Sequence, residues 1–203
     1  MTTLALSLAP SKDRARVRIA YQVAMVFAGA LLMSGLAQVS MKLPFSPVPI
    51  TGQTLGVLLV GASLGPSLAA ASMLLYLVWG FVGMPVFAPD ANGAHATGAA
   101  ALGFASASGG YLWGFVIAAW AVGELAKRGW DRTIRSAISA MLIGEIIIYA
   151  FGIPWLMQAL DVPLAKALGW GFYPFVIGDT LKLFIAAGVL PLAWKFTRRG
   201  SDD

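Results

Sequence analysis

The sequence contains no cysteine and only one histidine, and these shortages exclude several kinds of chemistry. Without cysteine the chain forms no disulfide, holds no cysteine-ligated iron–sulfur cluster and carries no thiol nucleophile. The single histidine, His95, has no further histidine or cysteine with which to build a typical zinc site. A G-x-x-x-x-G-K-[ST] loop is also absent, so the chain is not expected to hydrolyse ATP through such a loop. We therefore expect neither a metal nor another cofactor.

Charged residues are scarce as well. They make up 11% of the 203 residues, whereas 59% are hydrophobic. A soluble domain has about 25% charged and about 45–50% apolar residues, so we expect an integral membrane protein. The net charge of +5 does not indicate a nucleic-acid partner, because the charges lie at the ends of apolar segments, where they orient a chain in the lipid bilayer. The apolar run before the first basic residues is too short for a secretory signal.

Long apolar runs favour a helical bundle over a β-barrel, whose strands would alternate in short segments. As one helix, residues 52–85 would be about 51 Å long, too long for one span, and Gly65 and Pro66 divide this stretch into two. Dense prolines exclude a helix in residues 44–49. We predict an all-α membrane protein with one domain, residues 1–203, built as a six-transmembrane-helix bundle. Its spans are predicted over residues 19–41, 53–64, 67–84, 109–126, 137–160 and 174–194.

The basic residues predict the orientation of the bundle. Eleven of the fourteen lie in three clusters: Lys12, Arg14, Arg16 and Arg18; Lys127, Arg128, Arg132 and Arg135; and Lys195, Arg198 and Arg199. Four predicted spans and then two separate these clusters, so all three fall on one side. The positive-inside rule makes that side cytoplasmic, together with both termini. Loops 44–51, 85–108 and 161–172 then face outward, and the second of them is long enough to act as a lid.

The last predicted span carries Asp179 and Lys182 inside its apolar run. A charge near the middle of a spanning helix costs roughly 2.5–3.5 kcal/mol on insertion scales. Three residues apart on a helix, the two side chains share a face and can neutralise each other. They are therefore either a self-satisfied structural pair or a polar binding point that faces a cavity. We favour the binding point, because Asp179 lies only about 7–8 Å below the outer end of the span.

Several patterns could indicate an enzyme and were weighed against simpler interpretations. Residues 61–65 match G-x-S-x-G around Ser63, but His95 is expected on the opposite side of the membrane, so helix packing explains the pattern better. Glu145 and Asp179 could form a carboxylate pair for protease or proton chemistry. Lys182 is the nearer partner of Asp179, and Glu145 shares a helix face with Tyr149, to which it could simply bond. We therefore predict a chain that is not an enzyme.

What remains is the capture of a small molecule from outside. Asp179 can accept paired N–H groups, and Lys182 can donate to a carbonyl or a carboxylate. A mostly apolar pocket with a few placed polar groups is the usual design of a small-ligand site. Aromatic residues in or near the outer loops could supply its walls, namely Phe87, Tyr111, Trp113, Tyr173 and Phe175.

Small residues recur along one face of the first predicted span. Ala20, Ala24 and Ala28 follow one another at every fourth position, as do Ala30 and Ser34. Such spacing lets another helix approach closely. The face serves either a partner protein or tight packing inside this bundle.

Four motifs, in this order, carry a family resemblance. They are PVPITGQTLGVLL over residues 47–59, YLVWGFVGMPVF over 76–87, GGYLWGF over 109–115 and GDTLK over 178–182. With them the sequence resembles the BioY family, the biotin-binding S component of energy-coupling factor (ECF) transporters. It departs from the family pattern in an alanine-rich third outer region, where Ser106-Ala107-Ser108 precedes Gly109.

The resemblance implies a six-helix fold that binds biotin at its outer face, in the cytoplasmic membrane of a prokaryote. It implies ligand contacts by Asp179 and Lys182, and partners in a transmembrane coupling protein and two cytoplasmic ATPases. The alanine face of the first span would then dock on the coupling protein. The full set of expected ligand contacts is Asp179, Lys182, Tyr111, Gln53, Thr51, Asn92, Phe87 and Tyr149. The alternatives are an S component for another vitamin such as thiamine or riboflavin, an intramembrane enzyme, and a self-sufficient secondary carrier.

Overall fold

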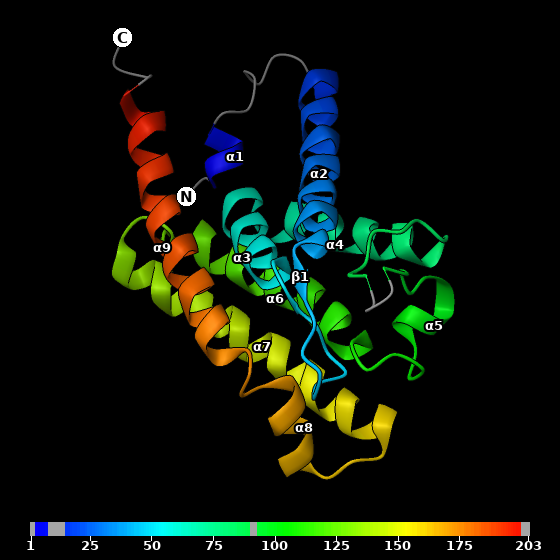
Figure 1. Cartoon of the computed structure of the whole chain (residues 1–203). Helices are drawn as coiled ribbons and strands as arrows, with labels where there is room; N and C mark the ends of the chain where they lie inside the picture. The colour runs from blue at the N-terminus through cyan, green and yellow to red at the C-terminus, as the bar shows by residue number, and fades with distance from the viewer. Residues whose placement is uncertain (1–2, 8–14, 90–92, 200–203) are drawn as a thin grey trace.

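The computed structural model describes residues 3–7, 15–89 and 93–199 of the chain. Apart from one pair of two-residue strands and an isolated bridge, these residues form helices joined by turns and loops (Figure 1). The helices are α1 (Leu4–Ser7), α2 (Ala15–Gln38), α3 (Gln53–Leu64), α4 (Pro66–Phe81), α5 (Gly98–Leu102), α6 (Gly109–Lys127), α7 (Ile134–Leu160), α8 (Leu164–Gly171) and α9 (Val176–Arg199). The strands β1 (Ser40–Met41) and β2 (Ile50–Thr51) pair antiparallel.

Four of the described helices, α2, α6, α7 and α9, are long and apolar enough to cross a membrane. Helices α3 and α4 are also apolar but have only 12 and 16 residues, which is about 18 and 24 Å of helix. They are separated where the sequence predicted a break. Gly65 has φ +82°, a left-handed conformation that glycine adopts without a steric penalty. Pro66 then opens α4, a position at which its missing N–H costs no helical hydrogen bond.

The helix boundaries differ from the predicted spans by up to five residues: α2 begins at Ala15 rather than at residue 19, and α9 ends at Arg199 rather than at residue 194. Helix α2 ends at Gln38 rather than at residue 41, because Ser40 and Met41 pair with β2. Helix α4 ends at Phe81, three residues before the predicted end, and α9 begins at Val176, two residues after the predicted start. The segment 161–173, which was predicted to be a short loop, contains the helix α8.

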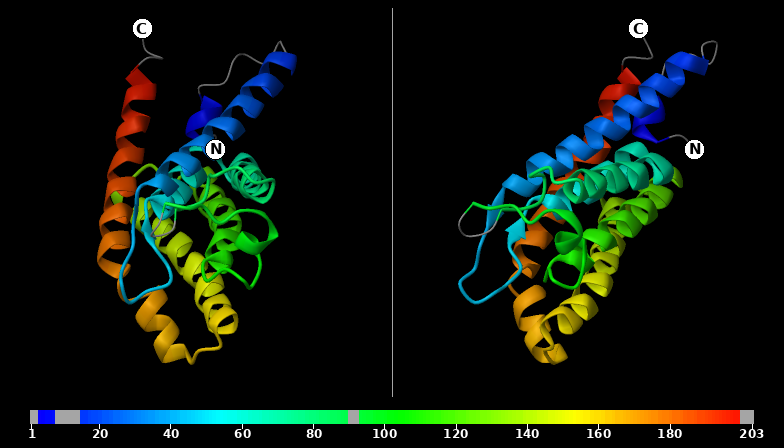
Figure 2. Two further views of the ribbon diagram at one scale, coloured as in Figure 1. Left: turned by 45° about the vertical axis from the view of Figure 1, so that its right-hand side comes forward. Right: turned by 90° about the vertical axis from the view of Figure 1, so that its right-hand side faces the viewer.

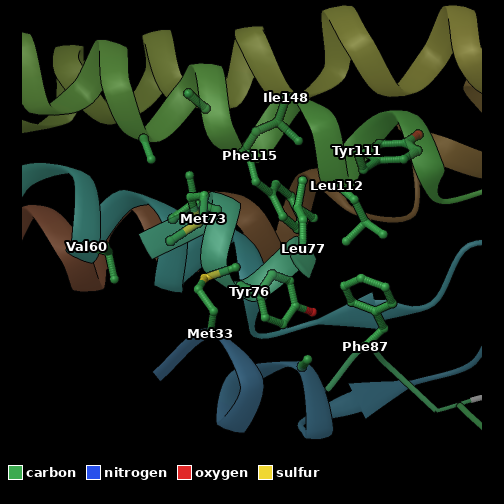
Figure 3. Packing of buried hydrophobic residues seen from close by; sticks show 14 of the residues in the cluster. Met33, Val60, Met73, Tyr76, Leu77, Phe87, Tyr111, Leu112, Phe115 and Ile148 are labelled. Atoms are coloured by element: carbon green, nitrogen blue, oxygen red, sulfur yellow. The ribbon is translucent and has the colours of Figure 1, made fainter. Parts of the chain in front are cut away.

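Helix α6 lies at the centre of the packing and contacts α7, α3 and α4. Small residues permit these close approaches. A side chain at Gly61 would meet the carbonyl oxygen of Ala119, and one at Gly123 would meet the backbone of Gly65 and Pro66. Figure 3 shows the apolar cluster that results, with Met33 from α2, Met73, Tyr76 and Leu77 from α4, Leu112 and Phe115 from α6, and Ile148 from α7.

The two ends of the molecule differ in character. The start of α2 and the end of α9 lie at one end, and α8 lies at the other (Figures 1 and 2). The α6–α7 loop also belongs to the first end, because Trp194 of α9 donates its Nε1–H to Asp131 Oδ2 at 2.5 Å. The described members of all three basic clusters therefore lie at one end of the bundle.

Helix α2 leaves much of its surface uncovered. The small residues predicted to dock a partner therefore fall into an exposed group and a group that faces the bundle. Ala20, Ala24 and Ala28 are exposed. Ala30, in contrast, is fully buried, and Ser34 is half-buried, with its hydroxyl donating to the carbonyl oxygen of Ala30 at 2.9 Å. The expectation that Ala30 belongs to a docking surface is therefore wrong. The three alanines at every fourth position, Ala20, Ala24 and Ala28, point outward, whereas Ala30 packs inside the bundle.

Candidate ligand-binding site

A cavity lies between the β1–β2 hairpin and helices α3, α6, α7 and α9, beneath the loops that follow α4 and α5. Its empty space amounts to about 980 Å³, including the part that is open at the mouth. Apolar side chains, among them Val48, Leu112 and Phe115, make up much of its wall. The cavity thus has the character of a pocket for a small, partly apolar molecule.

The polar floor of the cavity is an ion pair on α9. Lys182 Nζ lies 2.8 Å from Asp179 Oδ1, as the spacing on one helix face predicts. Asp179 is only 4% exposed. It occupies the first turn of α9, where the partial positive charge of the helix N-terminus favours a carboxylate. The pair therefore points into the cavity rather than toward lipid, which the sequence could not decide.

Residues from two other helices complete the hydrogen bonds of this pair. Thr54 Oγ1 of α3 lies 3.0 Å from Asp179 Oδ1 and 3.2 Å from Lys182 Nζ. Tyr149 of α7 donates its hydroxyl to Asp179 Oδ2. Lys182 Nζ also donates to the carbonyl oxygen of Thr51, at 2.5 Å. With Asp179, Thr51 and Thr54, the ammonium group has three acceptors for its three protons, so a ligand that bonds to Lys182 must replace one of them.

Gln53 lines the cavity but is tied into the surrounding structure. Its Nε2 donates to Tyr76 Oη at 2.7 Å, and its Oε1 accepts from Thr51 Oγ1 at 3.0 Å. Tyr76 Oη in turn lies 3.3 Å from the carbonyl oxygen of Val86. This chain of hydrogen bonds joins the start of α3 to α4 and to the loop after it. Gln53 consequently holds the rim of the pocket in place in addition to lining it.

Aromatic rings form the walls. Phe87 packs edge-on against Tyr76, with ring centroids 5.2 Å apart. Tyr111 packs edge-on against Tyr149 at 6.3 Å and donates its hydroxyl to the carbonyl oxygen of Gly171 at 2.9 Å. Phe175 also lines the cavity. Because the tyrosine rings are fixed by hydrogen bonds at their hydroxyl groups, they offer rigid flat surfaces to a ligand.

The remaining aromatic residues that were predicted as walls lie elsewhere. Trp113 is 40% exposed and lines a separate apolar groove, where its Nε1–H donates to the carbonyl oxygen of Leu102 at 3.1 Å. Tyr173 is 62% exposed, and neither residue lines the cavity. Trp113 lies on a face of α6 that is turned toward this groove, and Tyr173 lies in the turn between α8 and α9, so neither side chain faces the pocket.

The structure brings together all of the described residues that the sequence nominated as ligand contacts. Asp179, Lys182, Tyr111, Gln53, Thr51, Phe87 and Tyr149 line one cavity. Asn92 lies outside the described residues. Sequence reasoning missed Thr54, which bridges the floor pair, and Lys42, which adds a second cation to the lining. Thr54 directly follows the nominated Gln53, but nothing in the pattern indicated that it faces α9.

Of the residues that could indicate an enzyme, only Asp179 lines the cavity. Ser63 does not line the cavity, and Glu145 does not bond to Tyr149, whose hydroxyl donates to Asp179 instead. The expected Glu145–Tyr149 bond is therefore wrong. Among the described residues, no three His, Asp or Glu side chains gather as metal ligands would.

Comparison with known proteins places this chain in a family. The sequence model of the BioY family matches residues 8–199. The chain belongs to the BioY family. This confirms the resemblance that the four motifs indicated, and with its apolar helices it makes the chain a multi-pass membrane protein.

This BioY chain is similar to proteins of Rhizobium etli and Pyrococcus horikoshii. It is 32% identical over 169 residues to the biotin transporter BioY of Rhizobium etli, over 80% of this chain and 86% of that protein. It is 37% identical over 164 residues to the probable biotin transporter BioY of Pyrococcus horikoshii, over 80% and 90%. The crystal structure of the S-component for biotin from an ECF-type ABC transporter shares its fold, with a TM-score of 0.77 at 23% identity over 90% of this chain and 95% of that one.

Proposed function

We propose that this chain captures biotin at the outer face of the cytoplasmic membrane of a prokaryote, as the substrate-binding subunit of an ECF-type transporter. The observation that carries the proposal is the buried Asp179–Lys182 pair at the floor of an aromatic pocket in a chain of the BioY family. The chain has no catalytic role in this proposal. It binds the ligand and releases it unchanged.

The chemistry of the pocket suits the chemistry of biotin. Biotin has a ureido group with two N–H donors and one carbonyl oxygen, an apolar ring and chain, and a terminal carboxylate. Asp179 accepts N–H groups, and Lys182 donates to a carbonyl or carboxylate oxygen. The rings of Phe87 and Tyr111 cover the apolar parts. Because the Lys182 ammonium already has three acceptors in this arrangement, a ligand oxygen that bonds to it replaces a present contact such as the one between Lys182 and Thr51.

The bundle spans the membrane six times in this proposal, with α3 and α4 as two short spans and both termini cytoplasmic. Two observations support this orientation. The described basic residues at the start of α2, in the α6–α7 loop and near the end of α9 gather at one end of the molecule, and such residues favour the cytoplasmic side. The pocket is lined by the β1–β2 hairpin, which follows α2, and by the loop that follows α4. Both follow the helix ends that lie opposite the basic residues.

The partners in this proposal are a transmembrane coupling protein and two cytoplasmic ATPases. The exposed alanine stripe of α2, formed by Ala20, Ala24 and Ala28, would receive a helix of the coupling protein. An ATPase partner is also consistent with a sequence that lacks a phosphate-binding loop of its own.

The test is to identify the small molecule that copurifies with the protein from cells grown with biotin, by mass spectrometry, and to challenge it with a panel of vitamins. We expect retained biotin that excess thiamine and riboflavin do not displace. Retention of thiamine or riboflavin without biotin would refute the proposed ligand and favour an S component for that vitamin.

A further inference from the structure

One buried acid next to the pocket has no role in the site described so far. Glu145 lies on α7, one turn before Tyr149 and therefore about 6 Å further from the pocket mouth. It is only 5% exposed, and neither of its carboxyl oxygens has a hydrogen-bond partner among the described residues. It does not line the cavity. An ionisable residue inside a spanning helix is costly and usually serves a function.

The groups that could neutralise Glu145 are already engaged. On α9, Asp179 and Lys182 are paired with each other, and both act electrostatically on Glu145. On its own helix, the hydroxyl of Tyr149 donates to Asp179. On α6, the hydroxyl of Tyr111 donates to Gly171.

The other two helices that pack against α7 add no charge beside Glu145. Helix α3 contains no titratable residue. The one titratable residue of α8, Lys166, lies over the ring of Trp170, 4.5 Å from its centre. An ionised Glu145 would thus be a buried carboxylate without a donor among the described residues, which is strongly unfavourable, and a bound proton removes most of that cost.

We propose that Glu145 is a proton-binding site beneath the pocket, and that its proton sets the charge that the floor presents to a ligand. With Glu145 neutral, Asp179 and Lys182 cancel and the floor carries no net charge. With Glu145 ionised, the floor carries one negative charge. A ligand that brings a carboxylate, as biotin does in the proposed function on which this inference rests, then meets repulsion. Glu145 does not line the cavity, so it acts on the ligand only through its charge.

The consequence is a coupling between binding and protonation. Where Glu145 is ionised in the empty protein, binding of an anionic ligand takes up a proton from solution, up to one per site. Affinity therefore falls as the pH rises through the titration of Glu145. Two like charges about 10 Å apart repel enough, at an effective dielectric constant of about 20, to weaken binding about tenfold to twentyfold. A neutral analogue of the ligand, such as biotinamide, shows a smaller fall.

The experiment uses the full chain in detergent and measures biotin affinity by calorimetry between pH 6 and pH 9, where the carboxyl of biotin stays ionised. The variants are Glu145→Gln, which has the same shape but no charge at any pH, and the control Glu124→Gln. Glu124 is a partly exposed acid bonded to Arg128 at the far end of α6. We expect the wild type and the Glu124 variant to lose about tenfold or more in affinity across this range. The Glu145 variant keeps its affinity and takes up no proton. Equal pH profiles and equal proton uptake in all three proteins would overturn the proposal.

A second measurement needs no ligand to bind. Infrared spectroscopy of the ligand-free protein at pH 6 detects the carbonyl band of protonated, buried carboxylic acids, and the part of the wild-type band that is missing in Glu145→Gln belongs to Glu145. We expect that band to persist when the solvent pH exceeds the range in which exposed acids titrate. Its absence would overturn the proton site even if biotin binds, whereas its presence together with no biotin binding at any pH would leave Glu145 protonated and refute the proposed function instead.

Discussion

Removing one member of the floor pair is the sharpest test of the pocket. Replacing Lys182 with Met leaves Asp179 buried, 4% exposed, without its only cationic partner among the described residues. Replacing Asp179 with Asn leaves the ammonium with the carbonyl of Thr51 and the hydroxyl of Thr54. Breaking a buried, hydrogen-bonded charge pair costs about 2–5 kcal/mol, much of it from the stranded charge. Each single variant should therefore bind biotin about 30-fold to several thousand-fold more weakly.

The double variant distinguishes the loss of the charge pair from general damage to the fold. With both charges removed, no charge is stranded, so the loss should be smaller than the sum of the two single losses, by about 0.5–3 kcal/mol. The assay is calorimetric titration of detergent-purified protein, with the thermal unfolding midpoint recorded for each variant. Lys166→Met is the matched control, since Lys166 is a cation outside the cavity lining. Wild-type affinity in both single variants, or an equal loss in the Lys166 variant, would refute the assignment of the pair to the site.

Three further predictions follow from the packing and the surface. Ala24→Leu on the exposed face of α2 should abolish copurification of a coupling protein while biotin affinity stays unchanged, and an unaltered complex would contradict the docking surface. Gly110→Ala should lower the unfolding midpoint, because the added methyl group overlaps the Trp155 ring. The control Gly35→Ala, where nothing lies within 4 Å of the added methyl group, should leave the midpoint unchanged or raise it slightly. Burial raises the pKa of Asp131 above its usual range, so its contribution to stability is full below the ordinary pKa and is lost as the pH rises through the folded pKa. Unfolding midpoints measured against pH should show this fall in the wild type and not in Asp131→Asn.

The pattern of apolar runs was enough to predict most of the fold, for a physical reason. In a bilayer each spanning segment must be apolar over its whole length and must satisfy its own backbone hydrogen bonds, so span positions are encoded locally. Helix α3 begins and ends as predicted, and the break at Gly65 follows from local chemistry. Helix α8 was missed because its eight residues are too short to give a membrane signal.

A local sequence pattern was likewise enough to identify Asp179 and Lys182. Two charges inside an apolar run are costly wherever the helix sits, and their spacing on one face is a property of the helix alone. The sequence by itself therefore determined that the last helix carries a polar pair near its start, and that the chain belongs with proteins of this pattern.

Only the tertiary structure decided what that pair faces. Thr54 meets Asp179 across 125 positions of sequence, and the carbonyl of Thr51 meets Lys182 across 131. Helical periodicity tells which residues share a face but not which neighbour that face meets, because the rotation of each helix depends on packing against all the others. For the same reason the sequence could not separate the buried Ala30 from the exposed Ala24, or show that Glu145 has no hydrogen-bond partner among the described residues.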